Sequence, residues 1–243
     1  MTDLGTLGGD VSSAYGINNS GQVVGESVRT DGSWRAFITG PGDTGMTDLG
    51  TLLGGFYSKA LGINDSGQVV GNSRTGGETH VFITGPNGMG MTDLGTLLGG
   101  SYSGAFDIND SGQVVGRGRS ETTGGEMHAF ITGPNGMGMT DLGTLGGSFS
   151  AARGINDSGQ VVGRSETTGG ETRAFITGPD GMGMTDLNSF ADLPDGVALG
   201  DAWGINNQGQ VIAAIFPEPA SYALMLAGLG LVGFMARSKK QAA

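Results

Sequence analysis

Short apolar clusters separated by polar, glycine-rich segments recur along the whole chain. Within one period they predict four short strands, Thr-Asp-Leu-Gly-Thr-Leu, Ala-x-Gly-Ile, Gln-Val-Val-Gly and Ala-Phe-Ile-Thr. Asn-Asp-Ser-Gly between the second and third strands predicts a hairpin turn, because glycine readily adopts a positive φ. Gly-Pro-Asn-Gly after the fourth strand predicts another turn. No window before residue 220 has a helical period, so the pattern predicts an all-β protein.

The pattern returns about every 45 residues, and four strands in that length is the period of a propeller blade. One unit is too small to fold alone, so the array is expected to fold as a whole. The fifth unit lacks its Phe-Ile-Thr block, which gives 19 strands and an incomplete last blade. We expect a five-bladed β-propeller in which the N-terminal strand, residues 2–7, completes that blade; a β-solenoid is the alternative fold. The repeat domain, residues 1–214, divides into units 1–45, 46–90, 91–138, 139–183 and 184–214.

Three blocks carry a family resemblance. TDLGTLGG, GINDSGQVVG and HAFITG recur in fixed order over residues 1–212 and resemble the HAF-repeat family of extracellular bacterial proteins. The family name matches His128, Ala129 and Phe130. The resemblance implies export and a β-rich repeat fold, and it implies no particular ligand or activity.

Composition and charge narrow the possible partners. Glycine accounts for 51 of 243 residues without a collagen period, and the apolar clusters favour turn-rich β-structure over disorder. Three of the 12 basic residues lie in the last seven positions, which leaves 9 basic against 23 acidic residues, a net charge of −14, in the rest of the chain. Such a body repels nucleic acid and anionic lipid. The absence of cysteine excludes a disulfide scaffold and a thiolate zinc site.

The last 29 residues, 215–243, differ in character from the repeats. Residues 220–236 are uncharged and apolar and predict a hydrophobic helix about 25 Å long, slightly short of a ~30 Å hydrocarbon core. Arg237, Lys239 and Lys240 follow directly. The positive-inside rule then places the C-terminus in the cytoplasm and the repeats outside, with residues 220–236 in the lipid bilayer.

Pro217, Glu218 and Pro219 precede that segment. The order of Pro-Glu-Pro, glycine-rich apolar segment and basic end resembles the PEP-CTERM sorting signal, which implies recognition and cleavage by exosortase, a membrane protease. A plain membrane anchor and a buried core helix are the alternatives. The resemblance favours a transient inner-membrane anchor. No signal peptide precedes the repeats, and because Met1 occupies the place of the internal repeat methionines, we expect the native start to lie upstream.

Candidate catalytic and metal-binding residues are few. His80 and His128 alternate with arginine at equivalent positions, which indicates a solvated strand-end site rather than a catalytic base. The aspartates of the Met-Thr-Asp block are expected to bind backbone N–H groups at turns, although a propeller could instead bring them into an axial ring that binds a cation. No unique, non-repeated polar cluster is visible in the sequence, so we expect neither enzymatic activity nor a metal or other cofactor. The aspartates of the Met-Thr-Asp block are Asp3, Asp48, Asp93, Asp141 and Asp186.

The sequence therefore predicts an exported, non-catalytic repeat protein of the cell surface or extracellular matrix, with exosortase and possible exopolysaccharide as its partners. The alternative function is a carbohydrate-, ice- or cation-binding surface module that uses the recurring threonine and aspartate positions.

Overall fold

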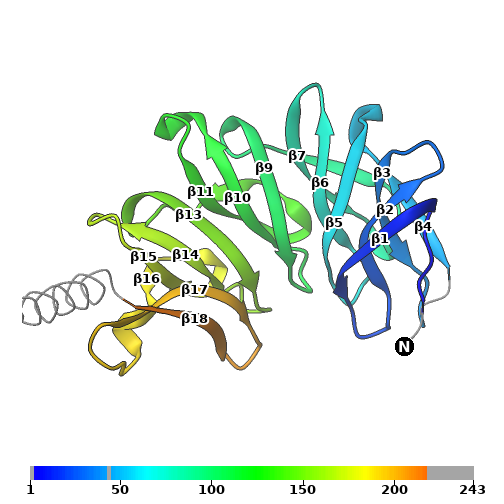
Figure 1. The fold of residues 1–243 in the computed structure, drawn as a ribbon. Coiled ribbons are helices and arrows are strands. Elements are labelled where there is room, and N and C mark those ends of the chain that lie inside the picture. The colour runs from blue at the N-terminus through cyan, green and yellow to red at the C-terminus, as the bar shows by residue number, and fades with distance from the viewer. Residues whose placement is uncertain (1–2, 43–44, 218–243) are drawn as a thin grey trace, which may run out of the picture.

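The computed structural model describes residues 3–42 and 45–217, and this part of the chain is all-β (Figure 1). Its strands form a 16-stranded mixed sheet and a separate two-stranded sheet. The large sheet divides into four antiparallel groups of four strands, here called blades 1 to 4, and the two-stranded hairpin is called blade 5. Blade 1 consists of β1 (Gly8–Ile17), β2 (Val23–Arg29), β3 (Trp34–Thr39) and β4 (Met46–Gly50). Blade 2 consists of β5 (Tyr57–Ile63), β6 (Val69–Thr75), β7 (Glu78–Thr84) and β8 (Met91–Gly95).

The later blades repeat this order. Blade 3 consists of β9 (Gly99–Ile108), β10 (Val114–Ser120), β11 (Met127–Thr132) and β12 (Met139–Asp141). Blade 4 consists of β13 (Gly146–Ile155), β14 (Val161–Thr167), β15 (Thr172–Thr177) and β16 (Met184–Asp186), and blade 5 of β17 (Val197–Ile205) and β18 (Val211–Pro217). The helical segments are single 3-10 turns, η1 (Leu52–Gly54), η2 (Pro86–Gly88), η3 (Glu121–Thr123), η4 (Pro134–Gly136), η5 (Pro179–Gly181) and η6 (Leu187–Phe190).

In blades 1 to 3 a single parallel pair joins the third strand to the first strand of the next blade, for example Trp34 with Tyr57 and Met127 with Phe149. Antiparallel pairing inside each blade agrees with a propeller and not with the parallel coils of a β-solenoid. The first strands of the blades contact one another and form the inner edge of the array. Figure 1 shows an open arc, with blade 1 at one end and blade 5 at the other.

The strand that we expected to complete the last blade does not do so. Residues 3–6 form no strand, and Leu7 makes an isolated parallel bridge with Arg29 of blade 1. In blades 1 to 4 the Met-Thr-Asp strand is the outermost one and pairs with the Phe-Ile-Thr strand of the preceding repeat unit. Because the fifth unit has no Phe-Ile-Thr block, its sheet offers no partner for such a strand. Blade 5 therefore has two strands among the described residues, where three were expected.

The core lies between the faces of adjacent blades. Val115 and Ile131 of blade 3 pack with Ile155, Val161 and Phe175 of blade 4, and equivalent clusters fill the other interfaces. One phenylalanine from each Phe-Ile-Thr strand is fully buried: Phe37, Phe82, Phe130 and Phe175. Each blade thus obtains its core from its neighbour, as expected of a repeat that cannot fold alone.

The glycine at the end of each Gln-Val-Val-Gly block is required because a side chain would not fit there. A Cβ on Gly116 would lie 2.0 Å from the carbonyl oxygen of Gly104 on the inner strand, and Gly71 meets Lys59 in the same way. These glycines have no positive φ. The second strand therefore approaches the first so closely that no side chain fits between them.

The Asn-x-Ser-Gly turns form a ladder of hydrogen bonds along one end of the array. The predicted turn is confirmed, since its glycine, for example Gly112, has a φ of 78°. Asn109 is buried, and its Nδ2 donates both to Gln113 within its own turn and to the carbonyl oxygen of Asn156 in the next blade. Equivalent bonds join Asn18 to residue 64, Asn64 to residue 109 and Asn156 to residue 206. The repeated asparagine therefore links neighbouring blades as well as closing its own turn.

Candidate functional site

The predicted sorting residues begin where the β-structure ends. Pro217 is the last residue of β18 and pairs with Val197. Glu218, Pro219, Arg237, Lys239 and Lys240, and the predicted hydrophobic helix 220–236, lie outside the described residues. Over residues 3–42 and 45–217, no helix has the length and apolar character that crossing a bilayer requires.

The histidines are not solvated as expected. The side chains of His80 and His128 are 17% and 9% exposed, and each Nδ1 lies 2.8 Å from a carboxylate oxygen, of Asp93 and Asp141 respectively. Burial lowers the pKa of His80, but its hydrogen bonds to Asp93 and Glu78 outweigh burial and raise that pKa above its ordinary value. Each histidine therefore joins the third strand of its blade to the fourth.

The aspartates of the Met-Thr-Asp block bind the backbone, as expected, and do not form an axial ring. Oδ1 of Asp48, Asp93 and Asp141 accepts the N–H of the glycine two residues later, at 2.7 Å in each case. Their strands β4, β8 and β12 are the outermost of each blade, far from the inner edge. Within the described ranges, no three histidine or acidic side chains lie close enough together to hold a metal ion.

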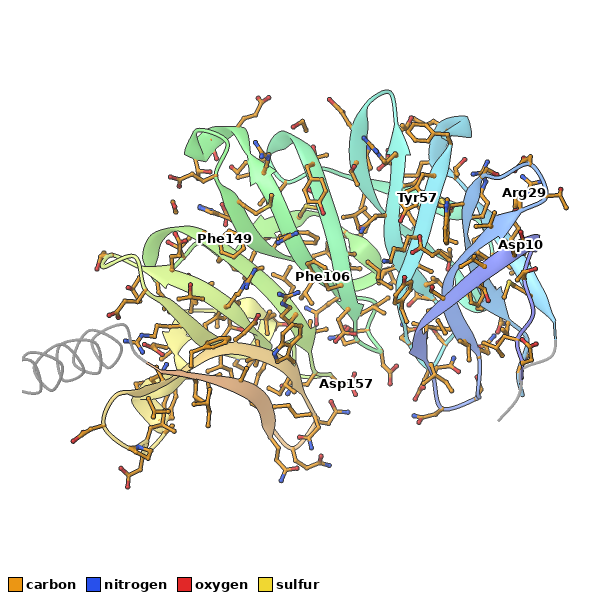
Figure 2. The ribbon with its side chains drawn as sticks, in the orientation of Figure 1. Asp10, Arg29, Tyr57, Phe106, Phe149 and Asp157 are labelled. Carbon is orange, nitrogen blue, oxygen red and sulfur yellow. The ribbon has the colours of Figure 1, made fainter. Side chains whose placement is uncertain are left out.

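Two positions that vary between units lie on the inner two strands of each blade. The third residue before the Asn-x-Ser-Gly turn and the residue after Gln-Val-Val-Gly differ in every or almost every unit. Phe106 and Phe149 lie on the facing inner strands of adjacent blades (Figure 2). We call the group formed by these and neighbouring side chains the arginine cluster: Phe106, Arg117, Phe149, Arg153, Arg164, Asp201 and Trp203.

Arg153 connects the members of this cluster. Its Nη2 lies 3.2 Å from Oδ2 of Asp201. Its guanidinium carbon lies 4.6 Å from the ring centroid of Trp203 and 5.5 Å from that of Phe106, both within the range of a cation–π interaction. Arg164 contacts the same carboxylate oxygen at 3.7 Å.

Positive charge exceeds negative charge in the cluster, with three guanidinium groups to one carboxylate. The guanidinium group of Arg117 lies 5.7 Å from the ring centroid of Phe106 and makes neither an ion pair nor a hydrogen bond with any described residue. The Nε atoms of Arg117, Arg153 and Arg164 are buried without a hydrogen-bond partner, and so is Oδ1 of Asp201. Buried polar atoms are normally paired, so the cluster has unused donors in a protein whose net charge is −11.

Nearby carboxylates are occupied elsewhere. Asp107 accepts hydrogen bonds from the backbone N–H groups of Ile108 and Ile155, which lie on two different blades. Burial raises its pKa to about 6, although these hydrogen bonds act in the opposite direction. Glu166 accepts a hydrogen bond from the hydroxyl of Ser148.

The equivalent positions of blades 1 and 2 are balanced. Glu26, which corresponds to Arg117, accepts hydrogen bonds from the hydroxyls of Tyr15 and Tyr57 and lies 3.5 Å from the ammonium of Lys59. One cation meets one anion there, and every acceptor has a partner. The excess of unpaired donors is a property of blades 3 to 5.

Sequence reasoning missed the arginine cluster and stated that no non-repeated polar cluster exists. Its members come from five strands and are separated by up to 97 positions, so proximity along the chain does not reveal them. A signal was present, however. Aligning the units shows Arg117 and Arg164 where the first two units carry Glu26 and Asn72, a departure from the repeat that marks one side of the array.

A second surface feature is an aromatic hollow of about 450 Å³ between blades 1 and 2. It is lined by Trp34, Phe56 and Tyr57, with Asp31 and Arg74 among its polar residues. Arg74 stacks on Phe56 at 5.5 Å, and Asp31 accepts two hydrogen bonds from Ser33. The polar groups of this hollow are thus engaged within the protein.

Comparison with known proteins supports the predicted sorting motif of the tail and the propeller-like β fold of the repeats. Residues 217–240 match the PEP-CTERM protein-sorting motif and include all six predicted sorting residues. No curated protein matches the chain. The described fold resembles a protein of Agrobacterium tumefaciens assigned as TolB, with a TM-score of 0.56, 14% identity and coverage of 86% of this chain and 75% of that one.

TolB from Acinetobacter baumannii is similar at a TM-score of 0.54 and 13% identity, over 73% of this chain and 43% of that protein. At such identities the likeness concerns the fold alone. The protein therefore combines an all-β, propeller-like repeat domain with a C-terminal PEP-CTERM motif, which indicates an exported protein that exosortase processes at the membrane.

Proposed function

We propose that this protein is an exported repeat protein of the cell surface or extracellular matrix, released from a transient membrane anchor by exosortase, and that its repeat domain binds partners without catalysis. The observation that carries the proposal is the PEP-CTERM motif at residues 217–240, directly after the last strand. The segment 220–236 would hold the chain in the inner membrane with its basic end in the cytoplasm. The recurrent blocks also support membership of the HAF-repeat family.

The position of the motif gives this sorting reaction a structural requirement. Because Pro217 is both the last residue of β18 and the first residue of Pro-Glu-Pro, no linker separates the blade 5 hairpin from the motif. The hairpin must therefore lie at the membrane surface when exosortase acts.

Cell fractionation with mass spectrometry of the mature C-terminus tests this proposal. In cells with exosortase we expect surface or secreted protein that ends near residue 218 and lacks the basic terminus. The Glu218→Ala, Pro219→Ala double variant should remain in the membrane with its C-terminus intact. Asp195→Ala removes an exposed acid upstream of the motif and should be processed normally. Surface protein that still ends at Ala243 would refute processing by exosortase.

The two ends of the arc support a closed five-bladed ring. Ile17 at the blade 1 end is 68% exposed, whereas its equivalents Ile108 and Ile155 are 5% and 6% exposed. Ile212 at the blade 5 end is 72% exposed, whereas its equivalent Val162 is fully buried. At the internal interfaces these two positions pack together, as Val115 and Ile155 do.

Cysteine crosslinking tests ring closure, because the natural chain has no cysteine. The variant Ile17→Cys, Ile212→Cys should form a disulfide within one monomer under mild oxidation. The control Ile17→Cys, Leu53→Cys pairs the first position with an exposed residue of η1 and should stay reduced. Disulfides that form only between two chains would refute a closed five-bladed ring.

A further inference from the structure

The arginine cluster contains three guanidinium groups and a single carboxylate. Arg153 and Arg164 share the single carboxylate of Asp201, whose side chain is 3% exposed. Arg117 has no anionic partner among the described residues. Holding like charges together in a partly buried place is unfavourable unless an anion joins them. Such an arrangement is typical of a site for an external anion.

The donor chemistry favours a carboxylate or another oxyanion. A guanidinium group presents its N–H donors in a planar fork that matches the two oxygens of a carboxylate. Cation–π contacts place the guanidinium group of Arg117 over Phe106 and that of Arg153 over Trp203, and Arg164 lies over Phe149 in the same way. These contacts use no N–H donor, so the three arginines are oriented in advance. Arg153 and Arg164 each also contact Asp201, whereas the guanidinium group of Arg117 donates to no described residue.

The aromatic residues add a second requirement to the ligand. Trp203 is 55% exposed, although Arg153 lies over its ring. Its open indole surface offers apolar area to a flat ligand next to the charged group. A ligand that matches both features carries a carboxylate on a ring with an apolar C–H face, and uronic acid sugars have this structure.

The acidic surface around the cluster argues against highly charged polymers. A net charge of −14 outside the basic tail opposes nucleic acid and anionic membranes at long range. A short acidic saccharide carries only a few charges, so it experiences less long-range repulsion than a duplex with one phosphate charge per ~1.7 Å, and it can place a single carboxylate in the positive cluster.

We propose that Arg117, Arg153 and Arg164, together with Trp203, form a binding site for the carboxylate-bearing ring of an acidic saccharide. This inference rests on the proposed binding role of the repeat domain and is independent of the sorting reaction. Failure of either one would leave the other intact, because saccharide binding is measured on the purified full chain without exosortase.

The test is calorimetric titration of the full chain in detergent, at low salt, with trigalacturonate. Saturable binding is expected, with no binding of the neutral galactotriose. Arg117→Gln should weaken binding about tenfold or more, because it removes charge-assisted hydrogen bonds. Arg74→Gln is the matched control, since it removes one charge and one cation–π contact in blade 2, and its affinity should equal that of the natural chain.

Stability and site location are controlled separately. The guanidinium group of Arg117 has no hydrogen-bond or ion-pair partner within residues 3–42 and 45–217, so Arg117→Gln should nearly keep the natural melting temperature. If the melting temperature of Arg117→Gln falls, the test uses Trp203→Ala instead, because truncating an exposed side chain leaves the core unchanged. Trp203→Ala should also weaken binding.

Three outcomes would overturn the proposal: no binding of trigalacturonate at millimolar concentration, unchanged binding by both variants, or equally tight binding of triglutamate. The last result would reassign the site to acidic peptides.

Discussion

The asparagine ladder allows a quantitative test of coupling between blades. We expect Asn109→Ala to destabilise the array strongly, because this buried side chain makes four hydrogen bonds. Its Nδ2 donates to Gln113 and Asn156, and its Oδ1 accepts from the backbone of Gln113 and the hydroxyl of Ser111. At about 1 kcal/mol for each bond, the free energy of unfolding should fall by about 4 kcal/mol, and more where buried partners stay unpaired.

The chain contains its own control for this experiment. Asn206 also makes three bonds within its turn: its Nδ2 donates to Gln210, and its Oδ1 accepts from the backbone N–H groups of Gln208 and Gln210. It is exposed, however, and donates to no further blade among the described residues. Water can replace the lost bonds there, so Asn206→Ala should cost less than about 1 kcal/mol. The difference between the two variants, about 3 kcal/mol, measures burial and the bond between blades.

Urea unfolding followed by tryptophan fluorescence measures both variants, because Trp34 and Trp203 report on opposite ends of the array. In the natural chain the two ends should unfold together. Asn109→Ala should lower the midpoint and separate the unfolding of the two halves, since it weakens the contact between blades 3 and 4. Equal destabilisation by Asn206→Ala and Asn109→Ala would refute the reasoning, because it would mean that only the local turn matters.

Three further predictions concern titration and packing. The folded-state pKa of Asp107, about 6, lies above its ordinary value of 3.8, so the free energy of unfolding should fall as pH rises from about 4 to 6. The expected loss is about 3 kcal/mol. It should be absent in Asp107→Asn when urea unfolding is compared at pH 4 and pH 7. The raised pKa of His80 acts in the same direction, at higher pH. The stability that this histidine contributes is fully present below pH 6.5 and is lost as pH rises through its folded-state pKa. The free energy of unfolding of His80→Gln should therefore change less between pH 6 and 9 than that of the natural chain. Gly116→Ala forces a Cβ against a backbone oxygen and should cost about 1–3 kcal/mol or more, whereas Gly169→Ala, which meets no atom closer than 3.7 Å, should leave the melting temperature nearly unchanged. Equal effects of the two glycine variants would show that the close approach of the two inner strands does not exclude a side chain at position 116.

The sequence by itself determined the local structure and the tail. Alternating apolar clusters predicted the four strand segments of each unit, and the Asn-x-Ser-Gly turns appear where they were expected. These features depend on residues within a few positions of one another, so periodicity and turn chemistry are enough to find them. The sorting motif was predictable for the same reason, since its proline-flanked acid, apolar segment and basic end are contiguous.

Only the tertiary structure decided which strands share a sheet and which side chains meet. The Met-Thr-Asp strand pairs with the preceding unit, and the N-terminal residues complete no blade, because pairing depends on which edge is available in space. The contact of His128 with Asp141 comes from strand pairing within a blade, and the gathering of Arg117, Arg153 and Arg164 comes from packing between blades. A repeat makes its units look equivalent in sequence. The few positions that break the repeat acquire a common location only when the array folds and places them on neighbouring inner strands.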